Sequence, residues 1–128
     1  MANVYMICPV RKATDADREA MERYVAGLEA QGHYVHLPHR DVDQTNDDGG
    51  VRICREHMAA MLLCEEVHVW LLPGQELSEG SFFDFGMAFM LSQFQLVRFV
   101  VANGLLKKTE HKSFQNLLKA LTEETSDE

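Results

Sequence analysis

The sequence predicts an α/β protein whose single domain contains a flavodoxin-like, doubly wound parallel sheet of four to five strands. Short apolar runs without polar alternation recur along the chain, as expected of strands that are buried on both faces. Segments with helical spacing of apolar residues separate these runs, and such alternation implies right-handed crossovers between parallel strands. The length of 128 residues fits one domain with a sizeable core. We therefore expect a domain over residues 1–122 and an acidic, flexible tail over residues 123–128.

The first part of the chain contains two strand-like runs separated by one helix-like segment. Residues 4–8 (VYMIC) are apolar, and Pro9 ends this first strand. Residues 15–31 carry apolar side chains at helical spacing, and Gly32 provides a C-terminal stop for the helix. Residues 34–37 (YVHL) predict the second strand.

The remainder of the chain continues the alternation of helix and strand. A polar, acidic stretch over residues 39–50 predicts an exposed loop. After it come helical segments and apolar strand-like runs; the helices are residues 53–64, 81–92 and 114–121, and the strands are residues 67–72 and 96–101. Pro73 and Gly74 end the central strand.

Composition and charge exclude several classes of function. The chain has 12 Lys and Arg against 20 Asp and Glu, and its formal net charge of −8 repels a nucleic-acid backbone, so we expect no nucleic acid polymer as a partner. No apolar run approaches the roughly 18 residues that cross a bilayer, which predicts a soluble protein without membrane association. Because residues 1–12 lack the features of a secretory signal, the expected compartment is cytoplasmic. A small-molecule ligand is favoured over a polymer.

The spacing of cysteine and histidine residues does not favour a disulfide framework or a metal site. The three cysteines lack a CxxC spacing, so buried thiols are the expected state. His33, His36 and His39 could suggest a metal, but no carboxylate is suitably spaced to complete a site. We expect no metal, and no organic cofactor is implied.

The ligand site is expected at one edge of the sheet. Ligands of doubly wound sheets bind outside the carboxyl ends of the strands, so the loops after Cys8, Leu37 and Leu72 are the places to search. A flavodoxin or phospho-receiver function is a weaker alternative. The loop over residues 9–14 lacks the Gly, Ser and Thr pattern that wraps a flavin phosphate, and no phosphorylatable aspartate directly follows the central strand.

The loop after the third strand leads into a helix whose first turn is expected to face the ligand. If Ser81 is the N-cap, free backbone N–H groups and the positive end of the helix dipole form an anion site there. Asp84 is then the third helical residue, and Gly80 and Gly86 permit close backbone approach. Asp84 could instead complete a capping box with Ser81, and the spacing leaves these two roles open.

Residues 80–88 (GSFFDFGMA) resemble the G-[ST]-x-x-E-x-G-x-A signature of nucleoside 2-deoxyribosyltransferases and the related nucleoside 5′-monophosphate N-glycosidases. Residues 4–11 (VYMICPVR) resemble the first strand and loop of this family, and residues 57–66 resemble its helix before the third strand. The resemblance covers roughly residues 4–90, and it implies cleavage or transfer of an N-glycosidic bond of a nucleoside or its 5′-monophosphate.

The resemblance implies a role for individual residues. Asp84 is implied to be the nucleophilic carboxylate and Tyr5 to steady it, while His57 assists the leaving base. Ser78 and Arg11 are implied to bind the phosphate, as in the branch of the family that cleaves monophosphates. Arginine suits this role because its guanidinium recognises phosphate in a bidentate manner. A solvent-exposed arginine and a half-buried structural histidine are the alternatives for Arg11 and His57.

Two substitutions relative to the family favour an alternative function, a catalytically silent nucleotide-binding or signalling module of the same fold. The family nucleophile is a glutamate, and Asp84 is one methylene shorter. Misplacement on the order of 1 Å can cost about a hundredfold in rate. His57 stands where the family has an aspartate, although an imidazole can also protonate a leaving base.

The aromatic residues of the same segment have two further interpretations. Core packing with one exposed ring is the favoured role of Phe82, Phe83 and Phe85, and base stacking is the alternative. Members of the family commonly pair so that one subunit completes the site of the other. The resemblance, together with the apolar residues of the 82–94 segment, therefore predicts a homodimer.

Overall fold

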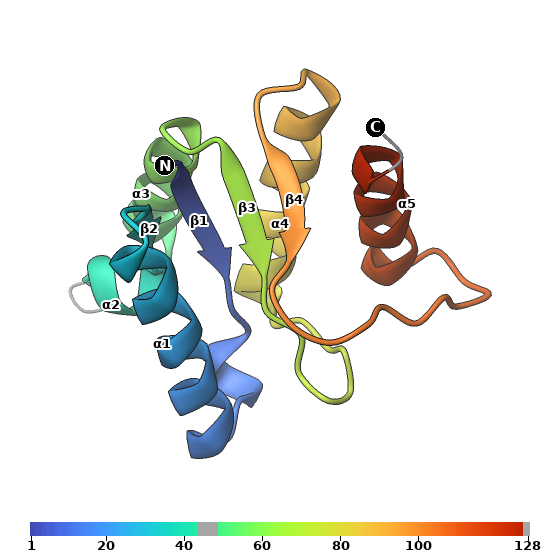
Figure 1. The fold of residues 1–128 in the computed structure, drawn as a ribbon, viewed down its shortest axis with the longest axis horizontal. Coiled ribbons are helices and arrows are strands. Elements are labelled where there is room, and N and C mark those ends of the chain that lie inside the picture. Colours follow the sequence, from blue (N-terminus) through green and yellow to red (C-terminus); the bar gives the residue numbers. More distant parts are fainter. Residues whose placement is uncertain (44–48, 127–128) are drawn as a thin grey trace.

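The chain forms a four-stranded parallel sheet with helices on both sides of it (Figure 1). The structure is a computed structural model and describes residues 1–43 and 49–126. The strands, in chain order, are β1 (Asn3–Ile7), β2 (Tyr34–His36), β3 (Glu66–Val69) and β4 (Arg98–Val101). They lie in the order β2-β1-β3-β4 and all pair in parallel. This order confirms the predicted flavodoxin-like, doubly wound α/β fold.

Within residues 1–43 and 49–126, five helices and one short turn connect and follow the strands. They are the 3-10 turn Val10–Lys12 and the helices α1 (Asp15–Ala30), α2 (Pro38–Asp41), α3 (Val51–Leu62), α4 (Glu79–Gln93) and α5 (Phe114–Ser126). Thr14 caps α1 through a capping box with Asp17, in which each side chain bonds the backbone N–H of the other residue. In the part of the chain that the structure describes, no helix has both the length and the apolarity needed to cross a membrane.

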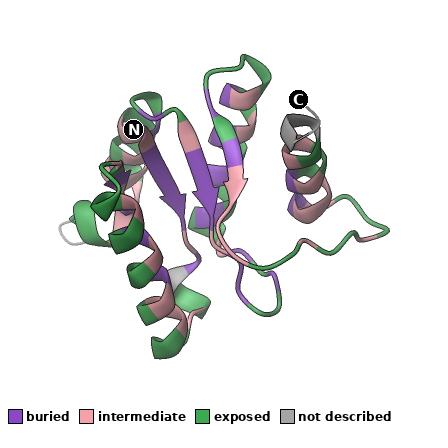
Figure 2. Cartoon of the chain, in the orientation of Figure 1, coloured by how far each residue is buried: buried purple, intermediate pink, exposed green. Residues whose placement is uncertain are grey.

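The two faces of the sheet bury separate clusters of side chains because successive residues of a strand point to opposite faces. Val4 and Met6 of β1 pack with Met21 and Val25 of α1. Tyr5, by contrast, belongs to the cluster on the other face. That cluster joins the sheet to α3, α4 and α5 and includes Ile7, Met61, Val67, Val69, Phe85, Ala88, Phe99 and Leu118. Figure 2 shows the buried strands between helices whose outer sides are exposed.

The register of the strands brings their carboxyl ends to one edge. Ile7 pairs with Val69, and Val69 pairs with Val101. The ladder continues past both strands, because Trp70 N–H donates to Ile7 O at 3.0 Å and Ala102 N–H donates to Val69 O at 2.9 Å. The segments that follow β1 and β3 therefore leave the sheet side by side, where the sequence places the ligand.

Strands β3 and β4 are shorter than the predicted ranges 67–72 and 96–101, and α3 begins and ends two residues before the predicted range 53–64. The structure differs from the expectation in three further places. The predicted loop over residues 39–50 contains the short helix α2, and residues 44–48 of that loop lie outside the described residues. Helix α4 begins at Glu79, two residues earlier than expected. Helix α5 continues to Ser126, into the segment predicted to be an acidic tail, and residues 127–128 lie outside the described part.

Acidification is expected to destabilise this fold because three histidines are at least partly buried. Burial lowers the pKa of His36, His39 and His68 below the ordinary value of about 6.5. The unfolded chain therefore binds more protons than the folded chain once the pH falls below about 6.5, and stability decreases with falling pH. The urea midpoint should be lower at pH 5.5 than at pH 7.5.

A matched pair of variants tests the origin of this pH dependence. His68→Gln removes a buried imidazole that bonds Glu66 Oε1 at 2.8 Å, and it should reduce the difference between the two midpoints. His111→Gln changes an exposed side chain and should leave that difference unchanged. Equal wild-type midpoints at the two pH values would contradict the prediction.

Candidate functional site

A cavity of about 270 Å³ lies at the carboxyl edge of the sheet. Its volume is near the lower end of the range of ligand pockets. It collects side chains from the turn after β1, from α2 and α3, and from the start of α4. Every site residue predicted from the sequence except Tyr5 lines it, namely Arg11, His57, Ser78, Gly80, Ser81 and Asp84.

Asp84 lies at the wall of this cavity with both carboxylate oxygens engaged by other elements. The residue is only 4 % exposed. Tyr5 of β1 donates its hydroxyl proton to Asp84 Oδ2 at 2.8 Å, and His57 Nδ1 of α3 lies 3.1 Å from Asp84 Oδ1. These contacts replace the capping box with Ser81 that the sequence spacing allowed. The structure thus brings together the three predicted catalytic residues.

The periodicity of β1 and α4 explains why Asp84 and Tyr5 meet. Tyr5 shares a face of β1 with Ile7, and that face packs against α4. In α4, Phe85 and Ala88 are buried against the sheet, so the neighbouring Asp84 is carried inward with them. The aspartate is therefore held on the buried side of the helix.

Burial and the Asp84 carboxylate keep the neighbouring acidic groups protonated. Burial, followed by the charge of Asp84, raises the pKa of Tyr5 well above its ordinary value, so Tyr5 remains a phenol that donates to Asp84. The same two causes raise the pKa of the Cys8 thiol, which lines the cavity. A protonated thiol is a poor nucleophile, so Asp84 is better suited than Cys8 to attack a ligand.

His57 has one ring nitrogen directed to Asp84 and another that is unpartnered. The carboxylate can only accept at Nδ1, so we assign the proton of the neutral ring to that nitrogen. Nε2 is buried, and no hydrogen-bond partner for it is found among the residues that the structure describes. The neutral ring can therefore accept a proton at Nε2, and the imidazolium can donate one there.

The expected anion-binding end of the cavity is the start of α4. Ser78, not Ser81, is the N-cap, and its Oγ accepts from Ser81 N–H at 3.3 Å. Ser81 is therefore not the N-cap, because the helix begins at Glu79, three residues earlier than that role requires. A Cβ added at Gly80 or Gly86 would meet nothing within 4 Å, so contacts within this chain require glycine at neither position.

Arg11 also lines the cavity. It is exposed within the 3-10 turn Val10–Lys12 and forms no ion pair within residues 1–43 and 49–126. Its neighbour Lys12 pairs with Glu76 across 3.1 Å, which ties this turn to the loop before Ser78. Glu79 also lines the cavity, so an anion bound there would lie near one negative side chain as well as one positive side chain.

Gln75, in the loop between β3 and α4, holds this loop against the segment that follows β4. This residue is buried and adopts a left-handed backbone conformation with φ of 55°. Its side-chain Nε2 donates to Leu105 O at 2.7 Å, and its Oε1 accepts from Lys107 N–H at 3.2 Å. The position of Ser78 is therefore supported by contacts with the segment after β4.

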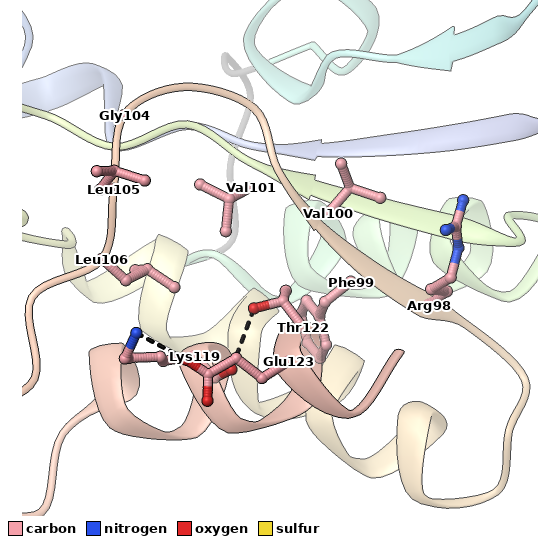
Figure 3. A pocket seen from close by; sticks show the side chains of 10 residues that line it. All are labelled: Arg98, Phe99, Val100, Val101, Gly104, Leu105, Leu106, Lys119, Thr122 and Glu123. Atoms are coloured by element: carbon pink, nitrogen blue, oxygen red, sulfur yellow. Dashed lines mark hydrogen bonds and ion pairs between the residues drawn. The ribbon is translucent and has the colours of Figure 1, made fainter. Parts of the chain in front are cut away.

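A larger hollow of about 370 Å³ lies between β4 and α5, away from all predicted site residues (Figure 3). Apolar side chains such as Val101, Leu105 and Leu106 line it. Two of its charged side chains, Lys119 and Glu123, form an ion pair with each other at 2.7 Å. The chemistry-bearing groups are therefore at the smaller cavity.

The sequence did not place two residues that line the cavity. For Phe82, Phe83 and Phe85 the sequence favoured core packing with only one exposed ring. In the structure two of these side chains are half exposed, Phe82 at 51 % and Phe83 at 50 %. His39 lines the cavity from α2 and was considered only as a metal ligand. The sequence marked the loop after Leu37 as a place to search, but no signal singled out His39 within it, because the segment has the pattern of a polar loop.

No cluster of three potential metal ligands occurs within the described ranges. The three cysteines form no disulfide within the described ranges, and Cys64 is buried while Cys8 and Cys54 are partly buried. No protein-family model matches the sequence, and no curated protein matches it.

Proposed function

We propose that this protein is an N-glycosidase or deoxyribosyltransferase that acts on a nucleoside 5′-monophosphate or nucleoside through Asp84. The proposal rests on the resemblance of residues 80–88 to the nucleoside 2-deoxyribosyltransferase-like family. The observation that carries it is a buried carboxylate at a cavity wall, bonded to both Tyr5 and His57.

In the proposed reaction, an oxygen of Asp84 attacks C1′ of the sugar while the bond from C1′ to the base breaks. The electron pair of that bond leaves with the base, and the imidazolium of His57 supplies a proton from Nε2. The transition state resembles an oxocarbenium ion, and the product is a glycosyl ester of Asp84. Water or a second base then attacks C1′, and neutral His57 accepts the proton that this nucleophile loses. The bond from C1′ to the Asp84 oxygen breaks, and its electron pair returns to the carboxylate.

Tyr5 supports this chemistry as a hydrogen-bond donor. Its phenol stabilises the carboxylate of Asp84 before attack and after release of the sugar. Arg11, Ser78 and the first N–H groups of α4 support the binding of a 5′-phosphate at the other end of the cavity. The reaction needs no metal or organic cofactor.

The exposed apolar residues of α3 and α4 support a homodimer. Met90 and Phe94 on α4 and Met58 and Leu62 on α3 are all exposed large apolar side chains, and the two helices are neighbours. Large exposed apolar patches commonly mark protein interfaces. Sedimentation of the purified chain tests this inference, and a monomer at micromolar concentration would contradict it.

Base release is the direct test of the proposed function. The purified chain is incubated with purine and pyrimidine 5′-monophosphates, in ribose and deoxyribose forms and beside the matching nucleosides, and free base is separated by chromatography. We expect release from at least one monophosphate and slower release from its nucleoside. A chain that releases no base from any of these compounds is not this enzyme.

A catalytically silent nucleotide-binding module remains the second candidate. It is favoured by the observation that both Asp84 oxygens already have partners within the chain, which suits a structural carboxylate. Thermal-shift measurements with the same compounds separate the two functions, since a binding module is stabilised by a nucleotide but liberates nothing.

Replacing Arg11 with alanine should weaken the use of monophosphates selectively. A guanidinium that contacts phosphate contributes about 1.5–3 kcal/mol through its charged hydrogen bonds, so the Michaelis constant should rise about tenfold or more for the monophosphate. The constant for the nucleoside should stay within about twofold. Arg23→Ala, which changes an exposed arginine of α1, serves as the matched control. An equal rise for both compounds would remove the phosphate assignment.

A further inference from the structure

We propose that Phe83 and His39 form a subsite for the base of the ligand, with Phe83 as the stacking face and His39 as a hydrogen-bonding group. This inference rests on the proposed function, because it divides the same cavity into an end for the phosphate and an end for the base. It concerns two residues that the resemblance gives no role.

Phe83 is an aromatic ring of α4 that the fold leaves open. It precedes Asp84, it lines the cavity, and it is half exposed. Its neighbours Phe82 and Phe85 both pack edge-on against Phe114, with centroids 5.9 Å apart in each pair. Phe83 takes part in no ring pair among the residues that the structure describes. The ring therefore remains available to a ligand.

The position of Phe83 matches where a base would lie. Consecutive residues of a helix diverge by about 100°, so Phe83 borders the space in front of Asp84 without sharing its direction. The base is bonded directly to C1′, the atom that Asp84 is proposed to attack. A base within that short reach can stack on the Phe83 ring, and Ile53 of α3 lines the same cavity with an apolar surface. Stacking of a base on an aromatic ring contributes about 1–3 kcal/mol.

His39 borders the cavity from the other side. It lies in α2, which follows β2, and β2 flanks β1 on the side away from β3. It is therefore separated along the sheet edge from Ser78, where the phosphate is proposed to bind. Its Nδ1 is buried, and the structure provides no partner for it within the described ranges.

The imidazole of His39 suits the edge of a neutral heterocycle. Burial is the main cause that lowers its pKa, so the ring is neutral near pH 7 and offers one donor and one acceptor. His39 also lines a second hollow beside α1, so it is tested separately from Phe83. A stacking face and a polar edge are together the features that recognise an aromatic base, and a sugar phosphate needs neither.

Calorimetric binding tests the subsite in the Asp84→Asn background, so that no ligand is consumed. The probes are adenosine 5′-monophosphate, uridine 5′-monophosphate and ribose 5-phosphate, which lacks a base. Phe83→Leu should weaken binding of at least one nucleotide about tenfold and leave ribose 5-phosphate within about twofold. Phe82→Leu is the matched control, because Phe82 has the same exposure on the same helix but does not line the cavity.

His39 is tested with two substitutions. His39→Phe keeps a planar ring but removes both nitrogens, and it should weaken nucleotide binding about threefold to tenfold without affecting ribose 5-phosphate. His39→Asn places a polar amide atom near the position of Nδ1 and should recover most of that loss.

The subsite proposal is wrong if nucleotide affinity is unchanged in Phe83→Leu or His39→Phe. It is also wrong if these variants lose ribose 5-phosphate binding to the same extent as nucleotide binding. A change confined to the oligomeric state of Phe83→Leu would place the ring in a subunit interface instead. If the nucleotides bind with the expected responses but wild-type protein releases no base, the glycosidase proposal fails and the subsite stands. If base is released but these variants bind normally, only the subsite fails.

Discussion

The Asp84→Asn variant is expected to lose release of base by roughly three orders of magnitude or more while keeping the fold. An amide oxygen is a poor nucleophile, and removal of a catalytic nucleophile commonly costs this much in rate. The amide has the same shape as the carboxylate, so it can still accept a hydrogen bond from Tyr5. The rate with the best monophosphate of the panel is the measurement, and the urea midpoint and far-ultraviolet circular dichroism report the fold.

A second carboxylate provides the control for this substitution. Asp15→Asn makes the same chemical change at an exposed position of α1, where Asp15 pairs with Arg18, and base release should stay within about twofold. Unchanged turnover by Asp84→Asn would show that the carboxylate only holds Tyr5 and His57 in place. In that case base release would not proceed through a covalent bond to Asp84, and the assignment of Asp84 as the nucleophile would be wrong.

The sequence predicted the alternation of strands and helices well because each element has a clear apolar pattern. Strand β1 is apolar on both faces, and the parallel order follows from the crossover helices. The exact ends of the helices and strands were harder to predict. Ser81 and Ser78 are both capping residue types, and only the packing of α4 selects Ser78 as the N-cap.

Most residues of the site could also be predicted from the sequence, but from a motif rather than from an apolar pattern. Asp84, Tyr5 and His57 were placed by motif resemblance, and the structure shows that they meet at hydrogen-bond distance. Spacing alone left Asp84 undecided between a cap and a ligand site, because both roles require a residue in the first turns of a helix. The contact with Tyr5 spans 79 positions, and no local pattern reports a contact of that range.

The parts of the cavity that the sequence missed depend on tertiary packing. Phe83 and Phe85 have the same side chain two positions apart on one helix, yet one is half exposed and the other is 4 % exposed. This difference in exposure arises because only one side of α4 packs against the sheet and α5, and Phe85 lies on that side. The place of His39 depends on the position of β2 beside β1, because α2 follows β2, and this position is set by the sheet order rather than by any motif.

Phe85→Ala is expected to cost about 3–5 kcal/mol of unfolding free energy, the largest stability effect among these predictions. The ring is 4 % exposed and lies between β4 and α5, with centroids 5.3 Å from Phe99 and 5.9 Å from Phe114. Its removal leaves a cavity and breaks two aromatic contacts at once. Urea unfolding monitored by circular dichroism measures the change.

Two further variants keep this prediction testable, because folded domains have only about 5–15 kcal/mol of stability and Phe85→Ala could unfold the chain outright. Phe85→Leu retains most of the apolar volume and should cost less than Phe85→Ala while remaining folded. Leu105→Ala removes a side chain that is 87 % exposed in the segment after β4 and should change stability by no more than about 0.5 kcal/mol. Phe85 adjoins Asp84 on the buried side of the helix. The packing of the Phe85 ring therefore stabilises the fold and also keeps the Asp84 carboxylate in contact with Tyr5. If Phe85→Ala and Leu105→Ala proved equally stable, α4 would not be fixed to the sheet through this ring, and the packing argument for the position of Asp84 would fail with it.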